Sequence, residues 1–200
     1  LQRESYSALW QASGVSDTFP NPLYYNWKYN TPYGKALIAV VYEGGRMVSS
    51  NAMIPLEFSY STMKVTCWQS CDTATAPHAR GKGYFFQCLM QLKSALKPNE
   101  IFYGFPNKNS VRGFEKIGWI RKGIVSTWLN PFPFFNVHNN NVQESCELPK
   151  SLDKHCTTAS TLCHERYCTI IRNSDYLNWR YIRNPNHKYT FLELSGDSTH

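Results

Sequence analysis

Residues 72–119 read DTATAPHARGKGYFFQCLMQLKSALKPNEIFYGFPNKNSVRGFEKIGW, and they carry the strongest evidence for the fold. Their pivot is the basic glycine loop Arg80-Gly-Lys-Gly-Tyr-Phe85. Residues 73–77 are typical of the end of a strand, and residues 84–96 have the apolar spacing of a helix. Glycine lets the backbone turn tightly, and the first N–H groups of a helix lack intrahelical partners and attract negative charge. This strand, loop and helix therefore predict a site for a phosphate anion.

The same residues exclude two common phosphate-binding loops. A nucleoside-triphosphate loop needs Gly-Lys-Ser/Thr after four spacer residues, and a dinucleotide fingerprint needs a third glycine. Neither pattern is present around residues 80–85. Because a Gly-x-Gly pair alone is common in turns, its interpretation depends on a second motif.

A second motif follows. Residues 101–105 (IFYGF) read as a strand that ends at Pro106. Asn107 comes next, followed by a small residue three positions later, an aromatic at seven and a Gly-aromatic pair at eleven and twelve: Ser110, Phe114, Gly118 and Trp119. Together the two motifs resemble those of the GNAT N-acyltransferase superfamily, over about residues 20–130. The resemblance implies an α/β (mixed α+β) fold, the GNAT fold, in which helices flank a central, twisted, mixed and largely antiparallel sheet.

The resemblance also implies an enzyme that transfers an acyl group, usually acetyl, from acyl-CoA to an amine by direct attack. We expect acetyl-CoA, or another acyl-CoA, as co-substrate and a small-molecule amine or amino sugar as acceptor. Loop N–H groups would hold the pyrophosphate, and the strand edge would pair with the pantetheine arm. Carried onto this sequence, the acyl-CoA residues are Thr73, Thr75, Ala76, Arg80, Gly81, Lys82, Gly83, Tyr84, Phe85 and Asn107. Asn107 could instead cap the next helix.

Two carboxylates are candidates for the catalytic base. Asp72 precedes the expected cofactor strand end, and Glu57 ends the preceding strand, so either could take a proton from the attacking ammonium. Either could equally be an ordinary solvated or hydrogen-bonded carboxylate. Cys71 as an acyl-accepting nucleophile is disfavoured, because the chemistry of the superfamily needs no covalent intermediate.

Two positions depart from the superfamily pattern. His78 stands where Gln or Arg is common, which would make one phosphate contact weaker or pH-dependent. Phe114 stands where many relatives carry a tyrosine that protonates the leaving thiolate, and phenylalanine has no proton to give. Either the thiolate leaves unprotonated, or Tyr103 or Tyr84 takes over this role.

An aromatic segment, LYYNWKY at 23–29, predicts a short helix before the turn at 30–34. The resemblance places this helix near the acceptor pocket, so Tyr25 and Tyr29 are substrate candidates. The alternative is that these rings simply pack in the core. We further expect a helix within 1–12, strands at 35–42, 47–60, 63–76, 100–105 and 120–129, and helices at 84–96 and 109–117.

Composition limits the partners. The 200 residues are 42% hydrophobic, which provides a real core. No apolar run reaches about 18 residues, so no membrane span is expected. The net charge of +7 would attract coenzyme A, whereas scattered basic residues disfavour nucleic acid. Seven cysteines without a signal peptide favour reduced thiols in the cytoplasm. The later ones fit no zinc motif, so no metal is expected: Cys146, Cys156, Cys163 and Cys168.

Residues 1–135 are predicted to form the acyltransferase-like domain, 136–174 a loop or helical connector, and 175–200 a further segment. In that segment YLNWRY at 176–181 echoes YYNWKY at 24–29 with a period of 152, and a strand pattern follows each. The segment either begins a second GNAT-like copy or is a helix–strand appendage on one domain, unless the match is chance. We expect a homodimer or a contact with a second GNAT-like domain, and a start at Leu1 favours an excised domain.

Two other functional classes stay open. A non-catalytic GNAT-fold module for binding or assembly is favoured by Phe114 and the apparent half-repeat, and opposed by the intact basic glycine loop. A nucleic-acid-binding protein rests on charge alone. The enzyme is the interpretation that we favour.

Overall fold

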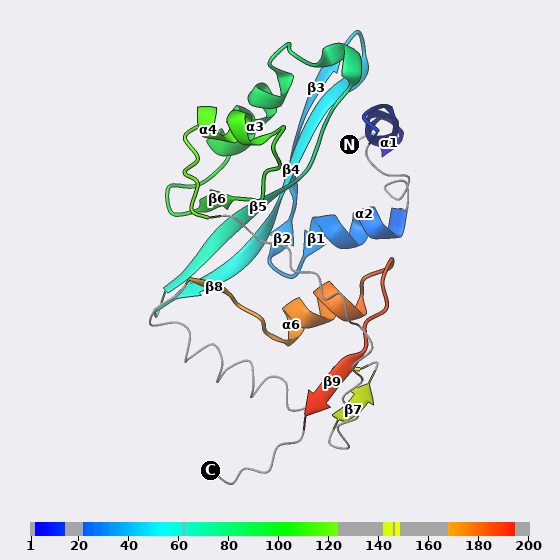
Figure 1. The fold of residues 1–200 in the computed structure, drawn as a ribbon, viewed down its shortest axis with the longest axis vertical. Coiled ribbons are helices and arrows are strands. Elements are labelled where there is room, and N and C mark those ends of the chain that lie inside the picture. The colour runs from blue at the N-terminus through cyan, green and yellow to red at the C-terminus, as the bar shows by residue number, and fades with distance from the viewer. Residues whose placement is uncertain are drawn as a thin grey trace.

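Two long antiparallel strands form the centre of the fold (Figure 1). In the computed structural model, which describes residues 3–14, 22–61, 63–123, 142–145, 147–148 and 168–194, they are β4 (Arg46–Tyr60) and β5 (Met63–Thr75). β3 (Leu37–Glu43) pairs antiparallel with β4, β6 (Ile101–Tyr103) pairs parallel with β5, and β8 (Thr169–Ile170) joins the end of β4. The predicted class, a mixed α/β fold with a largely antiparallel central sheet between helices, is confirmed.

Helices cover both faces of this sheet. α1 (Arg3–Ala12) and α2 (Pro22–Tyr29) lie on one face, and α3 (Tyr84–Ser94) and α4 (Val111–Lys116) lie on the other (Figure 1). Because successive side chains of a strand point to opposite faces, neighbours on β4 belong to different cores. Ala52 packs in the cluster that holds Tyr6, Leu9 and Trp10 of α1, whereas Met53 packs with Cys88 and Leu92 of α3.

The central helices and strands lie where the sequence predicts them, with shorter ends. The expected helices at 84–96 and 109–117 are Tyr84–Ser94 and Val111–Lys116, and the expected strand at 100–105 is Ile101–Tyr103. A 3-10 helix, Pro77–Ala79, joins β5 to the glycine loop. In the expected strand at 120–129, residues 120–123 are not strand, and 124–129 lie outside the described residues.

The remaining elements are short. β1 (Asn30–Thr31) pairs with β2 (Gly34–Lys35), and β7 (Val142–Ser145) pairs with β9 (Phe191–Leu194). α6 (Ser174–Leu177) continues into a π-helix, Asn178–Ile182. Most of the expected connector at 136–174 lies outside the described residues, so its boundaries remain predictions. Within the described part of the chain, every helix is too short or too polar to cross a membrane.

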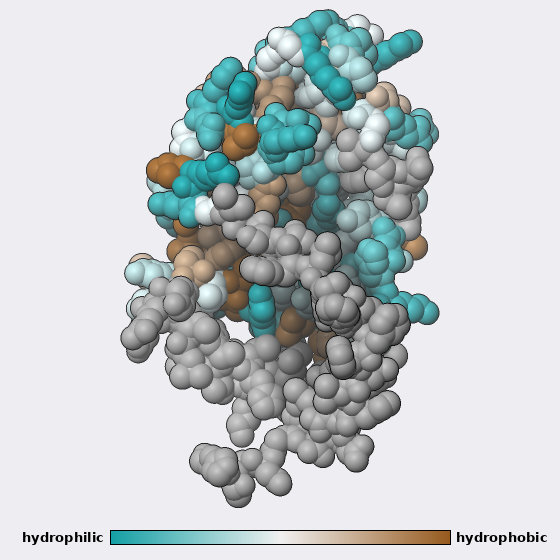
Figure 2. Space-filling view, viewed as in Figure 1, coloured by the Kyte–Doolittle hydropathy of each residue, from teal (hydrophilic) through white to brown (hydrophobic). Residues whose placement is uncertain are grey.

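On the face of the molecule that Figure 2 shows, the described surface residues are mainly polar. Figure 2 shows hydrophilic residues over much of the upper outline, with hydrophobic residues set deeper, near the middle.

Candidate active site

The site begins where β5 and β6 separate. The two strands pair only from Cys67↔Ile101 to Gln69↔Tyr103. On the other edge of β5, Ser50 faces Ala74 and Ala52 faces Cys71, so two residues of β5, Asp72 and Thr73, lie opposite the single residue between them on β4. This is a β-bulge, and its extra residue, Asp72, has a positive φ of 48°. Bulges bend a strand and increase its twist, which accounts for the separation from β6.

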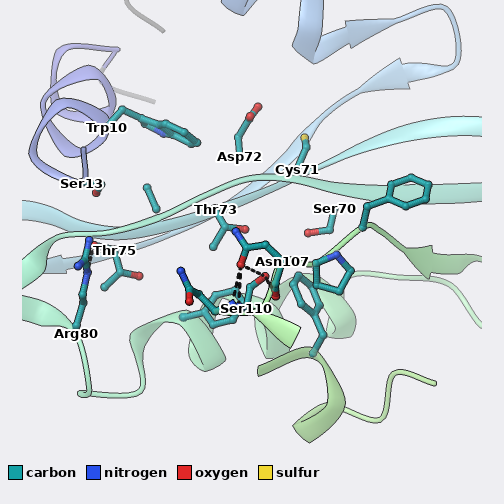
Figure 3. A pocket seen from close by; sticks show the side chains of 16 residues that line it. Trp10, Ser13, Ser70, Cys71, Asp72, Thr73, Thr75, Arg80, Asn107 and Ser110 are labelled. Atoms are coloured by element: carbon teal, nitrogen blue, oxygen red, sulfur yellow. Dashed lines mark hydrogen bonds between the residues drawn. The ribbon is translucent and has the colours of Figure 1, made fainter. Parts of the chain in front are cut away.

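A pocket of about 830 Å³ opens at this separation (Figure 3). Its walls combine five parts of the fold: α1 (Trp10, Ser13), β5 (Ser70 to Thr75), the loop after β6 (Phe105 to Asn107, Asn109), Arg80, and the starts of α3 and α4 (Phe85, Ser110, Phe114). Figure 3 shows Trp10, Cys71 and Asp72 on one side of β5, and Thr73, Arg80 and Asn107 on the other. The pocket thus has two sides, divided by β5.

The glycine loop joins this pocket to the N-terminus of α3. Gly81 and Gly83 have φ of 81° and 80°, the left-handed region that glycine adopts at low cost. Gly83 is the N-cap of α3, and no side chain caps the helix, so its first N–H groups are available to an anion. Arg80 lines the pocket, and its Nε donates to the Thr75 carbonyl at 3.3 Å. Lys82 is paired with Glu43, Nζ to Oε1 at 2.7 Å.

Buried polar side chains of β4 hold the two pocket threonines. Asn51 is fully buried, and its Nδ2 donates to the Thr73 hydroxyl. Ser49 is also fully buried, and its hydroxyl lies 2.9 Å from that of Thr75. Because buried polar groups are costly unless paired, these bonds fix the threonine rotamers at the open edge of β5.

The Asn107 side chain closes the turn that leads into α4, whereas the N-cap of α4 is Ser110 and no side chain caps this helix. Asn107 Oδ1 accepts from the N–H groups of Asn109 and Ser110, at 3.0 and 3.1 Å, and from the Ser110 hydroxyl at 3.2 Å. These bonds shape the turn into α4 and place Asn107 in the pocket wall (Figure 3). Within the described residues, its Nδ2 group makes no hydrogen bond and can donate to a ligand.

Asp72 is the centre of a polar network on the α2 side. Its Oδ1 accepts from Lys28 Nζ and its Oδ2 from the Tyr29 hydroxyl, both at 2.7 Å, and Tyr29 lies 3.1 Å from the Tyr6 hydroxyl. The Lys28 and Asp72 side chains are only 19% and 12% exposed. Burial lowers the pKa of Lys28, but the Asp72 carboxylate outweighs it, so this pKa lies above its ordinary value and the ammonium stays charged.

The other predicted catalytic and substrate residues do not line the pocket. Glu57, near the far end of β4, pairs with Lys64 at 3.5 Å. Tyr25 packs edge-on against Tyr29, with ring centroids 4.6 Å apart. Of the predicted acyl-CoA residues, the wall includes Thr73, Thr75, Arg80, Phe85 and Asn107, whereas Ala76, Gly81, Lys82, Gly83 and Tyr84 adjoin it along the chain.

Among the described residues, the pocket wall contains no tyrosine that could protonate a leaving group. Phe114 is 4% exposed, lies edge-on to Phe85 at 5.5 Å and packs against Trp119. The Tyr103 hydroxyl donates to Gln69 at 3.1 Å, and burial raises the pKa of Tyr103, so it holds its proton tightly. Burial also raises the pKa of the Cys71 thiol, which argues against a thiolate nucleophile.

Several wall residues could not be found from sequence. Trp10 and Ser13 come from α1, whose sequence pattern is weak, and Phe105, Asn109 and Ser70 reach the pocket only because the strands separate. Among the described residues, no cluster of three or more His, Cys, Asp or Glu could hold a metal ion. Of the four later cysteines, only Cys168 is described, as an exposed free thiol.

Comparison with known proteins identifies a family and a fold that agree with the observed architecture. A family model described as an acetyltransferase (GNAT) domain matches residues 5–121. A solved acetyltransferase from Trypanosoma brucei is 15% identical, with a TM-score of 0.50 over 65% of this chain and 95% of that chain. An aminoglycoside acetyltransferase from an uncultured soil metagenomic sample is 14% identical, with a TM-score of 0.50 over 64% and 88%. At such identities these two structures show the fold alone. No curated protein matches the chain.

Proposed function

The chain belongs to the GNAT acetyltransferase family, and from that premise we propose that it moves the acetyl group of acetyl-CoA to the amine of a small molecule, with an amino sugar as the specific candidate. The family makes the chain an N-acetyltransferase in the general sense. The acceptor, the path of the acetyl group and the roles of single residues are our proposal. The four described cysteines are free thiols, which supports a reducing, cytoplasmic location.

The open edge of β5 fits the extended arm of acetyl-CoA. The Ala76 N–H donates to the Val48 carbonyl at 2.9 Å, so Ala76 faces β4. Because backbone groups of successive strand residues point in opposite directions, Thr75 presents its N–H and C=O to the edge that β6 leaves open. An amide-containing chain laid along residues 71–75 would pair with this edge as an added strand does.

The glycine loop fits the pyrophosphate of the same molecule. The uncapped N–H groups of α3 and the Arg80 guanidinium converge at one end of the pocket. An anion there is stabilised by the helix dipole and by charge-assisted hydrogen bonds. Lys82 could join it by leaving Glu43, since both side chains are at least 40% exposed. Bound in this way, acetyl-CoA supplies an activated thioester whose carbonyl carbon accepts an amine.

Asp72 is the proposed base. A carboxylate offers about four lone-pair sites, and Lys28 and Tyr29 occupy one on each oxygen. The remaining sites can bind an acceptor ammonium and take its proton before attack. The contacts with Lys28 and Tyr29 fix the orientation of the Asp72 carboxylate. Glu57 does not lie at this pocket, so we assign the proton transfer to Asp72.

The leaving thiolate departs without a tyrosine acid in this proposal. Phe114 lines the pocket where a proton donor would stand, and its ring instead makes an apolar wall with Phe85. A thiol with an ordinary pKa of about 8.5 is a fair leaving group as the thiolate near neutral pH. Water or the acceptor's own proton can then neutralise it.

The observation that carries this proposal is the separation of β5 from β6 beside the N-terminus of α3. It is tested by calorimetric titration of the chain with acetyl-CoA and with CoA. We expect micromolar binding of both. Gly83→Glu should weaken this binding by at least about 100-fold, because the new carboxylate would occupy the phosphate site and repel the phosphate.

A matched control separates binding from backbone strain. Gly45 has a φ of 76°, close to that of Gly83, and a side chain there would meet no atom within 4 Å. Gly45→Glu adds the same charge and similar strain in the β3–β4 turn and leaves the N-cap position of α3 unchanged, so it should weaken binding far less than Gly83→Glu does. Equal affinity in both variants would remove the loop assignment. If acetyl-CoA binds, thiol release with a panel of amino sugars and other amines identifies the acceptor, and binding without release would indicate a non-catalytic module.

A further inference from the structure

Two tryptophans from distant parts of the chain form a reciprocal pair. Trp27 of α2 and Trp179 of the π-helix stack with ring centroids 5.4 Å apart and planes inclined by 22°. The Trp27 indole N–H donates to the Trp179 carbonyl at 2.5 Å, and the Trp179 indole N–H donates to the Trp27 carbonyl at 2.9 Å. Each indole N–H donates to the backbone carbonyl of the other tryptophan, and such reciprocal contacts are typical of two segments related by a local two-fold axis.

The residues around this pair repeat in sequence and in structure. Residues 24–29 (YYNWKY) and 176–181 (YLNWRY) are offset by 152, which is also the separation of the two tryptophans. Each tryptophan lies three residues after a tyrosine whose ring it contacts. The centroid distance is 5.2 Å for Tyr24 and Trp27, and 5.9 Å for Tyr176 and Trp179. The same local arrangement is therefore built twice and docked on itself.

A one-residue difference between the copies explains the π-helix. After the shared tyrosines, Pro32 matches Pro185 and Lys35 matches Lys188, so the offset grows to 153. The extra residue falls beside the π-helix, in which the Arg183 N–H donates to the Asn178 carbonyl at 2.8 Å. A turn closed over five residues instead of four accommodates one additional residue without ending the helix.

α2 connects this pair to the proposed base. The three consecutive residues Trp27, Lys28 and Tyr29 contact Trp179, Asp72 Oδ1 and Asp72 Oδ2 in turn. α2 is thus held on one side by the C-terminal segment and on the other by β5. A second bond supports the same segment, because the Tyr33 hydroxyl, just after α2, donates to the Ile171 carbonyl at 2.8 Å. Figure 1 shows α6 along the side of α2 that faces away from α1.

We propose that residues 174–182 are a second copy of α2 that acts as a clamp, and that the reciprocal tryptophan pair holds Lys28 and Tyr29 against Asp72. Trp179 is in this view a positioning residue, which touches no reacting atom. The catalytic meaning of the clamp rests on the proposed function, because it matters to acetyl transfer only if Asp72 is the base. The clamp itself can be tested without any acceptor.

The probe is acetic anhydride at low dose, with the acetylated lysines quantified by mass spectrometry. Lys28 is 19% exposed and ion-paired, whereas Lys64 is 68% exposed and serves as the internal reference. In Trp179→Ala, α2 loses the stacked ring and one hydrogen bond, so Lys28 should leave Asp72 more often. We expect its acetylation relative to Lys64 to rise at least about fivefold, as for a local opening. Arg180→Ala, at the next residue, should leave it unchanged.

Two further readouts identify the cause. Stacked indoles give an exciton couplet in far-ultraviolet circular dichroism, and either Trp27→Ala or Trp179→Ala should abolish it, because each removes one ring of the pair. Trp179→Phe keeps a stacked ring but loses the N–H donor, so it should give intermediate Lys28 acetylation in a chain that remains folded. Acetyl-CoA affinity should change by less than about twofold, because the glycine loop lies on the other side of β5.

The outcomes separate the two proposals. Loss of the couplet with unchanged Lys28 acetylation would overturn the clamp. Absence of acetyl-CoA binding in the parent chain would instead defeat the proposed function while leaving the clamp result intact. A rise in Lys28 acetylation in Arg180→Ala as large as in Trp179→Ala would also count against the tryptophan pair.

Discussion

In its middle β5 lies between two strands, whereas at its loop end it lies against only one. From Met63 to Gln69 its edges are covered by β4 and, at the last three residues, by β6. From Cys71 to Thr75 the β6 edge is open, a bulge interrupts the β4 edge, and a pocket occupies the gap. β5 thus stabilises the sheet where both of its edges are paired, and it lines the pocket where one edge is open. The difference arises from a single extra residue, Asp72.

The two ends also contain contrasting ion pairs, and the largest expected effect compares them. Asp72→Ala leaves the Lys28 ammonium, which is 19% exposed, without its carboxylate partner, so the free energy of unfolding should fall by about 3 kcal/mol. Glu57→Ala removes only a surface contact to Lys64, which is 68% exposed, and should cost less than about 0.5 kcal/mol. Urea unfolding followed by fluorescence measures both.

A second substitution tests the reason for the loss. If the cost comes from an uncompensated ammonium, adding Lys28→Met to Asp72→Ala should restore most of the stability. A double variant no more stable than Asp72→Ala alone would show that the bulge itself, and not the charge, holds the loop end together.

A smaller effect is expected from the packing of the pocket wall. A Cβ added at Gly113 of α4 would lie 2.3 Å from a ring carbon of Phe85. Gly113→Ala should therefore push this ring toward the pocket, cost about 1–2 kcal/mol despite the better helix propensity of alanine, and weaken acetyl-CoA binding. Thermal unfolding and titration measure the two effects. Gly123→Ala, where a Cβ meets nothing within 4 Å, is the control, and Phe85→Leu should relieve the clash.

The smallest effect concerns the paired end and alkaline pH. Burial raises the pKa of the Cys67 thiol from about 9 to about 12. A folded-state pKa above the unfolded one favours folding at pH values below the unfolded pKa, and this contribution is lost as the pH rises through the folded pKa. Between pH 9 and 10 the thiol ionises in the unfolded chain but not in the folded one. The contribution of Cys67 to the free energy of unfolding therefore falls by about 1 kcal/mol. Cys67→Ala should flatten this slope, as measured by urea unfolding at the two pH values.

The glycine loop and the central helices and strands were predictable because their signals are local. Gly81 and Gly83 have a positive φ, a conformation that glycine in the sequence already indicates. The apolar spacing of residues 84–96 likewise indicates the buried face of α3. The order of the strands followed from the two spaced motifs. In each case the physics acts within a few residues along the chain.

The pocket and its network were not predictable in the same way. The left-handed conformation of Asp72 occurs in a residue type that gives no clear signal for it, and the bulge depends on the register with β4. The ion pair of Lys28 and Asp72 joins residues 44 apart, and Trp10 reaches the pocket only through the packing of α1. The repeat was visible at 176–181, but its reciprocal docking on Trp27 was not.

The open edge of β5 has a further consequence for the behaviour of the protein in solution. Unpaired strand groups are a template on which any other extended chain can add, including the same strand of a second molecule. Residues 71–75 form such an edge, protected on one flank by the turn at Asn107. The pantetheine arm of bound acetyl-CoA would cover it. Solubility would then depend on the supply of co-substrate, so that the protein is most prone to self-association when acetyl-CoA is scarce.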